Sequence, residues 1–210
     1  MPISFENRAG ELHYVKAAKT KKGGTRYYIV KDKNKYKPEE LLEEIPVGFE
    51  FYELPSDGLV TFRKIIKSKI TDEEVSILDF VMKQHKTVRD YILDKEESAL
   101  MLYILESRDG TWGILDEEEC KKFRRYDEKL RFEKTENGLY RAQRFCYLSR
   151  YYGWITMEST ENLKYLAEKY CYHADKESLL QFWIEGEEEP QAEAIGEIDG
   201  QPVFGFTLEF

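Results

Sequence analysis

The dipeptide Asn137–Gly138 constrains the fold of this chain more than any other feature of the sequence. Asn-Gly is the strongest short-range signal for a β-hairpin, because a tight hairpin turn needs positive φ at both central residues. Aromatic and apolar residues recur on both sides of it, so the turn predicts antiparallel strands over 129–134 and 139–148. A short strand over 154–157 is expected to continue the same sheet. The fold must therefore contain antiparallel β-structure.

Further hairpins are predicted where turn residues separate strand-like stretches. Gly23–Gly24 and the segment 55–58 (PSDG) supply such turns near the N-terminus. The predicted strand pairs are 11–19 with 25–31, 49–54 with 59–65, 88–94 with 99–106, and 194–198 with 203–210. The run 99–105 is apolar on both faces, which is typical of a central strand. In the last strand an alternating apolar stripe predicts a buried face, made of Phe204, Phe206, Leu208 and Phe210.

Helical signals are interspersed with these hairpins. A proline followed by acidic residues predicts a short helix over 39–44, and a capping-box pattern predicts a helix over 72–85. Two more helices are expected after residue 158, one capped by Ser159 or Thr160 and one capped by Asp175.

Together, these predicted strands and helices indicate an α+β fold of antiparallel β hairpins with interspersed helices. The order of elements suggests a small N-terminal ββαββ module over 1–66, packed on a larger α+β domain over 67–210. One continuous domain is the alternative, because 210 residues are compatible with either arrangement.

Composition narrows the class of protein. The net charge of −9 argues against a protein that coats nucleic acid over its whole surface. No apolar run reaches the length of a membrane span, and the first residues lack the pattern of a secretory signal, so no membrane partner is expected. Three cysteines without close pairing fit a reducing compartment. We therefore expect a soluble, cytoplasmic protein.

Motifs that carry chemistry are scarce. The sequence has no glycine-rich phosphate loop and no nucleophile elbow. Cys171 and His173 are the one close pair of soft ligands, and a structural zinc site generally needs four, so no metal and no cofactor is predicted. Cys171 is expected to pack as a small apolar residue at the end of a helix. No catalytic residue can be assigned from the sequence.

The charge is segregated along the chain, and this pattern is the most informative functional signal. Residues 16–37 hold nine basic residues and one acid, and residues 120–152 hold ten basic residues and four acids. Tyrosines and phenylalanines interleave with both stretches. Basic side chains neutralise phosphates and aromatic faces stack on bases, so this mixture suits single-stranded nucleic acid or RNA. The candidate contacts are Lys16, Lys19, Lys21, Lys22, Arg26, Tyr28, Lys31, Arg141 and Arg144.

Several alternatives stay open at this point. Lysines that alternate with tyrosines are also typical of a solvated edge hairpin, in which the charges prevent aggregation. The stretch 38–58 has seven acids and no base, and the acidic helix predicted over 39–44 could lie over the basic hairpin and neutralise it. An acidic protein could also be the partner. An enzyme whose site is assembled from distant residues is a further alternative. Tyr27 and Tyr28 are adjacent in a strand, so one should pack inside and the other should be exposed.

The stretch 19–28 (KTKKGGTRYY) followed by 45–53 (IPVGFEFYE) resembles an uncharacterised prokaryotic family of cytoplasmic proteins. The later stretches 140–147 (YRAQRFCY) and Trp154–Ile155 fit the same pattern. The resemblance covers about half of the chain and implies no activity, so it supplies no functional residue. The Lys/Gly turn and Tyr-Tyr strand also resemble the small arm-type DNA-binding domain of phage integrases.

Overall fold

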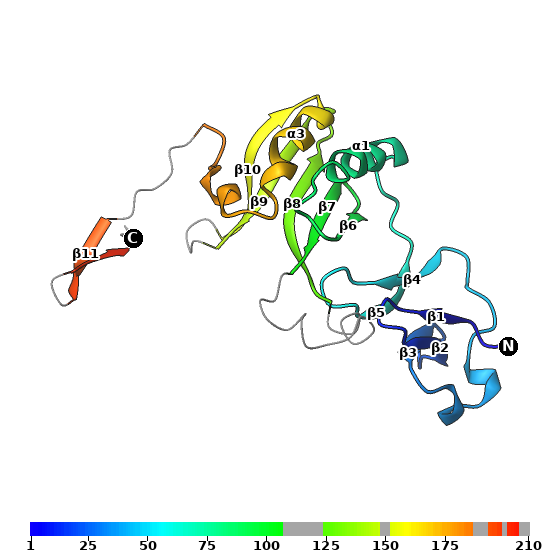
Figure 1. Cartoon of the computed structure of the whole chain (residues 1–210). Coiled ribbons are helices and arrows are strands. Elements are labelled where there is room, and N and C mark those ends of the chain that lie inside the picture. The colour runs from blue at the N-terminus through cyan, green and yellow to red at the C-terminus, as the bar shows by residue number, and fades with distance from the viewer. Residues whose placement is uncertain (107–123, 148–151, 187–192, 199–200, 206–210) are drawn as a thin grey trace.

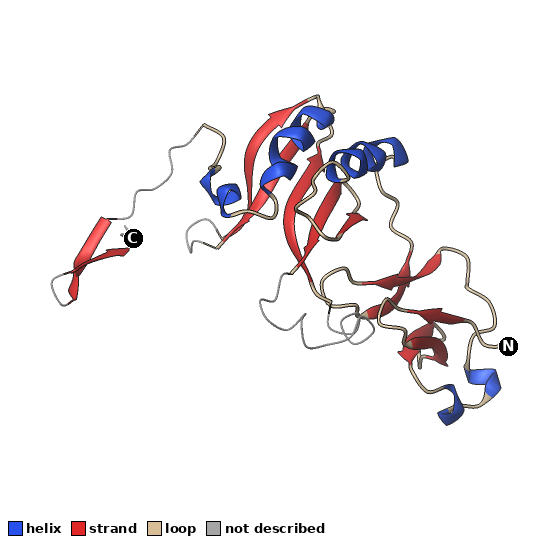
Figure 2. Ribbon diagram, in the orientation of Figure 1, coloured by secondary structure: helices blue, strands red, loops and turns tan. Residues whose placement is uncertain are grey.

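The computed structural model describes residues 1–106, 124–147 and 152–186, together with the backbone of 193–198 and 201–205. It has the α+β architecture that the sequence predicts, with antiparallel sheets and few helices (Figures 1 and 2). The first five strands form two small sheets, and the next five form one larger sheet.

The N-terminal part contains a three-stranded sheet in the order β1-β2-β3 and a separate hairpin, β4-β5. Their bounds are Ser4–Glu6 for β1, Leu12–Lys19 for β2, Thr25–Val30 for β3, Phe49–Glu53 for β4 and Val60–Lys64 for β5. Both predicted hairpins are confirmed, and β1 is a strand that the sequence did not predict. Aromatic rings join the two sheets: Tyr27 lies edge-on to Phe49 and Phe62, with ring centroids 5.0 and 5.4 Å away.

The predicted helix over 39–44 is wrong. Two short 3-10 helices, η1 (Lys33–Lys35) and η2 (Pro38–Glu40), follow β3, and the helical turn ends at Glu40. Leu41 instead forms an antiparallel bridge with Lys16, and the Leu42 amide donates to the Val15 carbonyl at 2.9 Å. The backbone groups that a longer helix would use internally are thus engaged by β2, and tertiary pairing overrides the local helical propensity.

The larger sheet is an antiparallel meander in the order β10-β9-β8-β7-β6. Its strands are β6 (Tyr91–Lys95), β7 (Ala99–Leu105), β8 (Tyr126–Lys134), β9 (Tyr140–Cys146) and β10 (Gly153–Thr160). The Asn-Gly turn joins β8 to β9, as predicted, and Gly138 has the positive φ of 81° that such a turn requires. β7 lies between two neighbours and is buried on both faces at its start, which confirms the prediction of an internal strand.

Two α-helices pack side by side on one face of this sheet: α1 (Asp72–Met82) and α3 (Leu163–Tyr170) (Figure 1). They cover a core that includes Leu78 and Leu166 from the helices and Leu102, Leu130 and Phe132 from the strands. The predicted capping box of α1 is confirmed, since the Thr71 hydroxyl accepts from the Glu74 amide and the Glu74 carboxylate accepts from the Thr71 amide. The helix ends at Met82, three residues earlier than predicted.

The predicted caps of the later helices need correction. Asn162 caps α3, because its side chain accepts from the Tyr165 amide, while Ser159 and Thr160 belong to β10. The helix predicted after Asp175 is a 3-10 helix, η5 (Glu177–Gln181), which Lys176 precedes without a side-chain cap. A further 3-10 helix, η4 (Cys171–His173), follows α3 directly.

The last predicted hairpin is present as β11 (Glu193–Ile198) paired with β12 (Gln201–Gly205). Its turn at 199–200 and the last residues, 206–210, lie outside the described residues. The same is true of the side chains of the predicted apolar stripe, so that expectation stays a prediction.

Candidate functional site

The β2–β3 hairpin presents a face that combines cations with an exposed tyrosine. Lys16 lies opposite Tyr28 in the strand register, and Ala18 lies opposite Arg26. Because cross-strand partners share a face of the sheet, Lys16, Arg26 and Tyr28 lie on the same side. Tyr28 is 45% exposed, whereas Tyr14, on the same side of the hairpin, is buried. Tyr27 points the other way into the aromatic contacts with β4 and β5, so the predicted division of the two tyrosines is confirmed.

The tip of this hairpin carries cations that have no ion-pair partner in the described part of the chain. Lys19, Lys21, Lys22 and Arg26 are all exposed, and none of them forms a salt bridge there. The turn itself is well defined, since Gly23 has a φ of 83° and the Thr20 amide donates to the Gly24 carbonyl at 2.7 Å. The tip therefore holds these positive charges in solvent.

Two other predicted contacts of the hairpin region are paired with acids. Lys16 Nζ lies 2.9 Å from Glu40 and 4.4 Å from the centre of the Tyr36 ring. The hydrogen bond to Glu40 raises the pKa of Lys16. Lys31 Nζ lies 2.8 Å from Glu11 and lowers the pKa of that carboxyl. Of the acids expected to neutralise the hairpin, Glu40 does so by pairing with Lys16, although the acidic helix predicted over 39–44 does not form. Glu11, which pairs with Lys31, comes from outside that segment.

Arg141 and Arg144 lie on β9, in the other sheet and away from β2 and β3 (Figure 1). Arg141 is exposed and its Nη1 is 3.4 Å from Glu133. Arg144 is 4% exposed, and its guanidinium donates to the carbonyls of Phe182 at 2.6 Å and Leu180 at 3.3 Å. Arg144 thus ties the end of η5 to the sheet and is not part of an exposed basic face. The sequence shows its charge but not its burial.

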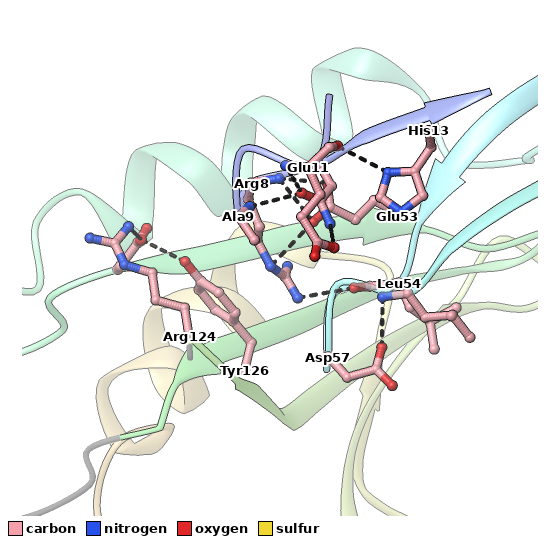
Figure 3. Close-up of polar contacts among 12 residues, drawn as sticks. Arg8, Ala9, Glu11, His13, Glu53, Leu54, Asp57, Arg124 and Tyr126 are labelled. Atoms are coloured by element: carbon pink, nitrogen blue, oxygen red, sulfur yellow. Dashed lines mark hydrogen bonds and ion pairs between the residues drawn. The ribbon is translucent and has the colours of Figure 1, made fainter. Parts of the chain in front are cut away.

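A polar network that the sequence did not predict joins the N-terminal sheets to the larger sheet (Figure 3). The Arg8 guanidinium donates to the Leu54 carbonyl at 3.1 Å, pairs with Glu53, and lies 4.9 Å from the centre of the Tyr126 ring. The Tyr126 hydroxyl donates to Asp90 at 2.7 Å. Burial, together with this hydrogen bond, raises the pKa of Tyr126 to about 12.

A cavity of about 830 Å³ adjoins this network, and we call it the junction pocket. It is lined by 7–11, His13, Ile29, Lys31, 57–60 and Arg124. These residues come from four separate segments, which is why no local motif revealed the pocket.

A second cavity, of about 760 Å³, lies at the ends of β7, β8 and β9. Its charged lining includes the ion pairs Arg124–Asp90 and Lys129–Asp127. Burial and the nearby Glu96 and Asp127 raise the pKa of Glu128 at its rim.

The cysteines described by the structure are free and buried, as predicted. Cys171, the C-cap residue of α3, is fully buried, which raises the pKa of its thiol to about 12. Cys146 is also buried, and Cys120 lies outside the described residues. Within the ranges that the structure covers, no group of His, Cys, Asp and Glu has the arrangement of a metal site.

Comparison with known proteins returned no relative: no family model matches the chain, and neither does any curated protein or solved structure. Among the described helices, none is both long and apolar enough to cross a membrane. The site must therefore be interpreted from its own geometry.

Proposed function

We propose that the chain binds single-stranded nucleic acid through the outer side and tip of the β2–β3 hairpin. We call this surface the basic hairpin face and define it by Lys16, Lys19, Lys21, Lys22, Arg26 and Tyr28. The observation that carries the proposal is the exposed Tyr28, which lies on one face with Arg26 and near the tip lysines, for which the described part of the chain offers no ion-pair partner.

The chemistry of this face suits a single strand better than a duplex. A tyrosine residue that is 45% exposed can stack on an unpaired base, whereas bases inside a duplex already stack on one another. The flexible lysines of the tip can follow the phosphates on either side of the stacked base. Stacking on one aromatic ring contributes about 1–3 kcal/mol, so Tyr28 would be the main non-ionic contact.

The acidic remainder of the chain supports a localised site. With a net charge of −9, the chain as a whole repels a polyanion, so a site that binds one must be a local concentration of positive charge such as the basic hairpin face. Glu40 neutralises Lys16 at the base of the hairpin, so the strongest positive potential is expected at Lys19, Lys21 and Lys22. Binding is therefore expected to be weak at physiological salt and steeply dependent on salt.

The test is fluorescence polarisation with a labelled oligothymidylate and with a labelled duplex, at several salt concentrations. Each phosphate contact with a single strand contributes about 0.7 to the slope of log affinity against log salt. Lys21→Glu/Lys22→Glu should weaken binding and reduce this slope by about 1.4. The matched control, Lys67→Glu/Lys86→Glu, makes the same change in net charge at two exposed lysines of the larger domain and should change the slope little.

Three outcomes would contradict the proposal. Absence of binding by the unmodified chain at low salt would show that the lysines are a solvated edge. Equal loss of binding in the hairpin variant and in the control would show a response to net charge alone. Competition by polyglutamate that matches competition by the oligonucleotide would identify an acidic protein as the partner instead.

A further inference from the structure

Three aliphatic side chains are exposed at the open end of the β4–β5 hairpin, where β5 runs on toward α1 (Figure 1). Ile45, Val47 and Ile65 are 48%, 101% and 51% exposed. The Ile65 amide donates to the Gly48 carbonyl at 2.9 Å, which holds the two segments that carry these residues side by side. Isolated exposed aliphatic residues are common, but a group of them marks an interaction surface more often.

The fold does not require an aliphatic residue at the tip of this end. Residues 46–49 form a turn, in which the Phe49 amide donates to the Pro46 carbonyl at 3.0 Å. Gly48, the third residue of the turn, supplies the positive φ of 81° that the turn needs. Val47, the second residue, is fully exposed and is not constrained by the turn to be apolar. Its apolar surface therefore stays in water unless a partner covers it.

Charges of opposite sign accompany these aliphatic residues. Glu44 directly precedes Ile45, and Lys64, the last residue of β5, directly precedes Ile65; both charged side chains belong to exposed residues. Neither of them forms an ion pair with any residue in the ranges that the structure describes. The surface thus combines apolar groups with one available anion on its first segment and one available cation on its second.

We propose that this surface binds a second copy of the chain about a twofold axis. We call it the self-association face and define it by Glu44, Ile45, Val47, Lys64 and Ile65. In a twofold interface the same surface of both copies meets, so the surface must be complementary to itself. The aliphatic residues of one copy can pack against those of the other. Glu44 of each copy can then pair with Lys64 of the other, so that the ion pair forms twice.

The mixed charge of this face favours a second copy over other partners. Glu44 and the net charge of −9 repel anionic lipid headgroups and nucleic acid alike. A stable complex buries about 800 Å² on each partner, which is more than three aliphatic side chains supply. Self-association is therefore expected to be weak and dependent on concentration. This inference does not rest on the proposed nucleic-acid function, because no residue of this face belongs to the basic hairpin face.

The first test is sedimentation velocity of the full chain at concentrations from micromolar to millimolar. The average sedimentation coefficient should rise with concentration. Val47→Ser should raise the dissociation constant at least about tenfold, because a twofold dimer loses the contact twice. The matched control is Leu59→Ser, which changes an aliphatic residue that is 58% exposed at the other end of the same hairpin. It should leave the dissociation constant unchanged.

The second test exchanges charges to identify the partner. Glu44→Lys places a cation opposite Lys64 of the other copy, and Lys64→Glu places an anion opposite Glu44. Each variant alone should therefore associate more weakly than the parent chain. An equimolar mixture should restore association, because each heterodimer contains two attractive pairs. The measurements use about 0.15 M salt, at which exposed charges more than about 8 Å apart are largely screened, so the change in net charge has little effect.

All substituted residues are exposed, so each variant should keep the Tm of the parent chain. The proposal is overturned if the parent chain sediments as a monomer at every concentration, or if Leu59→Ser weakens association as much as Val47→Ser. It is also overturned if the mixture of charge variants associates no better than either variant alone. A monomeric parent chain that binds phosphatidylcholine vesicles, and loses this binding in Val47→Ser, would identify a lipid surface as the occupant instead.

Discussion

Replacing Glu74 by glutamine should destabilise the chain through the loss of one buried charge. Glu74 lies at the start of α1, and its side chain is 9% exposed. Its carboxylate accepts hydrogen bonds from Lys134 at 2.6 Å and from the Tyr140 hydroxyl, which joins the helix to β8 and β9. Glutamine can still accept from the Thr71 amide in the capping box, so the substitution isolates the charge from the cap.

The size of the effect follows from the two lost charge-assisted bonds. A hydrogen bond to a charged group contributes about 1.5–3 kcal/mol. When the glutamine oxygen keeps the cap to Thr71, its NH2 group, which cannot accept, replaces the oxygen that accepted from Lys134 and Tyr140. The Lys134 side chain is 26% exposed, so its ammonium recovers part of its hydration. We expect the free energy of unfolding to fall by about 2 kcal/mol. For a chain of this size, that corresponds to a decrease in Tm of about 4–8 °C.

The assay is thermal and urea unfolding at several pH values. Burial alone would raise the pKa of Glu74, but the hydrogen bonds from Lys134 and Tyr140 lower it below its ordinary value of 4.5. A carboxyl with a lowered pKa stabilises the folded state above its unfolded pKa, and this stabilisation is lost as the pH falls through the folded pKa. The difference between the parent chain and Glu74→Gln should therefore be full at pH 7 and should shrink below pH 4.5.

The control is Glu73→Gln, which removes the same charge from the neighbouring, exposed position in the first turn of α1. It should have a much smaller effect on unfolding. If Glu73→Gln and Glu74→Gln were equally destabilising, only the helix dipole would matter, and the account of a buried charge at the junction of α1, β8 and β9 would be refuted.

Three other substitutions or reactions test separate contacts. Arg144→Leu removes the hydrogen bonds of a buried guanidinium to Phe182 and Leu180, so urea unfolding should show a loss of about 2–4 kcal/mol. Burial raises the pKa of Asp94 more than the hydrogen bond from Tyr52 lowers it, so ionisation of Asp94 opposes folding. Asp94→Asn removes this ionisation, so it should raise Tm at pH 7 but not at pH 3. The Cys171 thiol is buried, and burial raises its pKa to about 12. Mass spectrometry should therefore detect no alkylation of Cys171 by iodoacetamide until the chain is unfolded in urea.

Local signals explain which parts of the fold the sequence predicts well. The turn at Asn137–Gly138 and the capping box at Thr71 depend on residues within a few positions of each other, and the structure contains both. The helix predicted over 39–44 does not form, because the backbone of Leu41 and Leu42 pairs with β2. The two paired segments are about 25 residues apart in the sequence. No local pattern reports such a pairing.

In the candidate site, too, local patterns predict some features, whereas others depend on contacts between distant segments. Strand alternation alone predicts that Tyr27 and Tyr28 face opposite ways, and the structure has this arrangement. Arg144 was predicted as a nucleic-acid contact because it belongs to a basic stretch of the sequence. The sequence does not show that the end of η5 packs over this arginine and buries it. The junction pocket was missed because its lining residues come from four separate segments that lie together only in the folded chain.

The most direct test of the proposed function is a map of amide chemical shifts on titration with a short oligothymidylate. If the basic hairpin face is the site, saturating shifts should concentrate on β2 and β3, above all at Arg26 and Tyr28 and at the lysines of the turn. Tyr28→Ala should abolish the stacking contribution while Tm stays close to that of the parent chain, because this ring is exposed. Shifts that are absent, or that are spread over the chain without a maximum at this hairpin, would contradict the account.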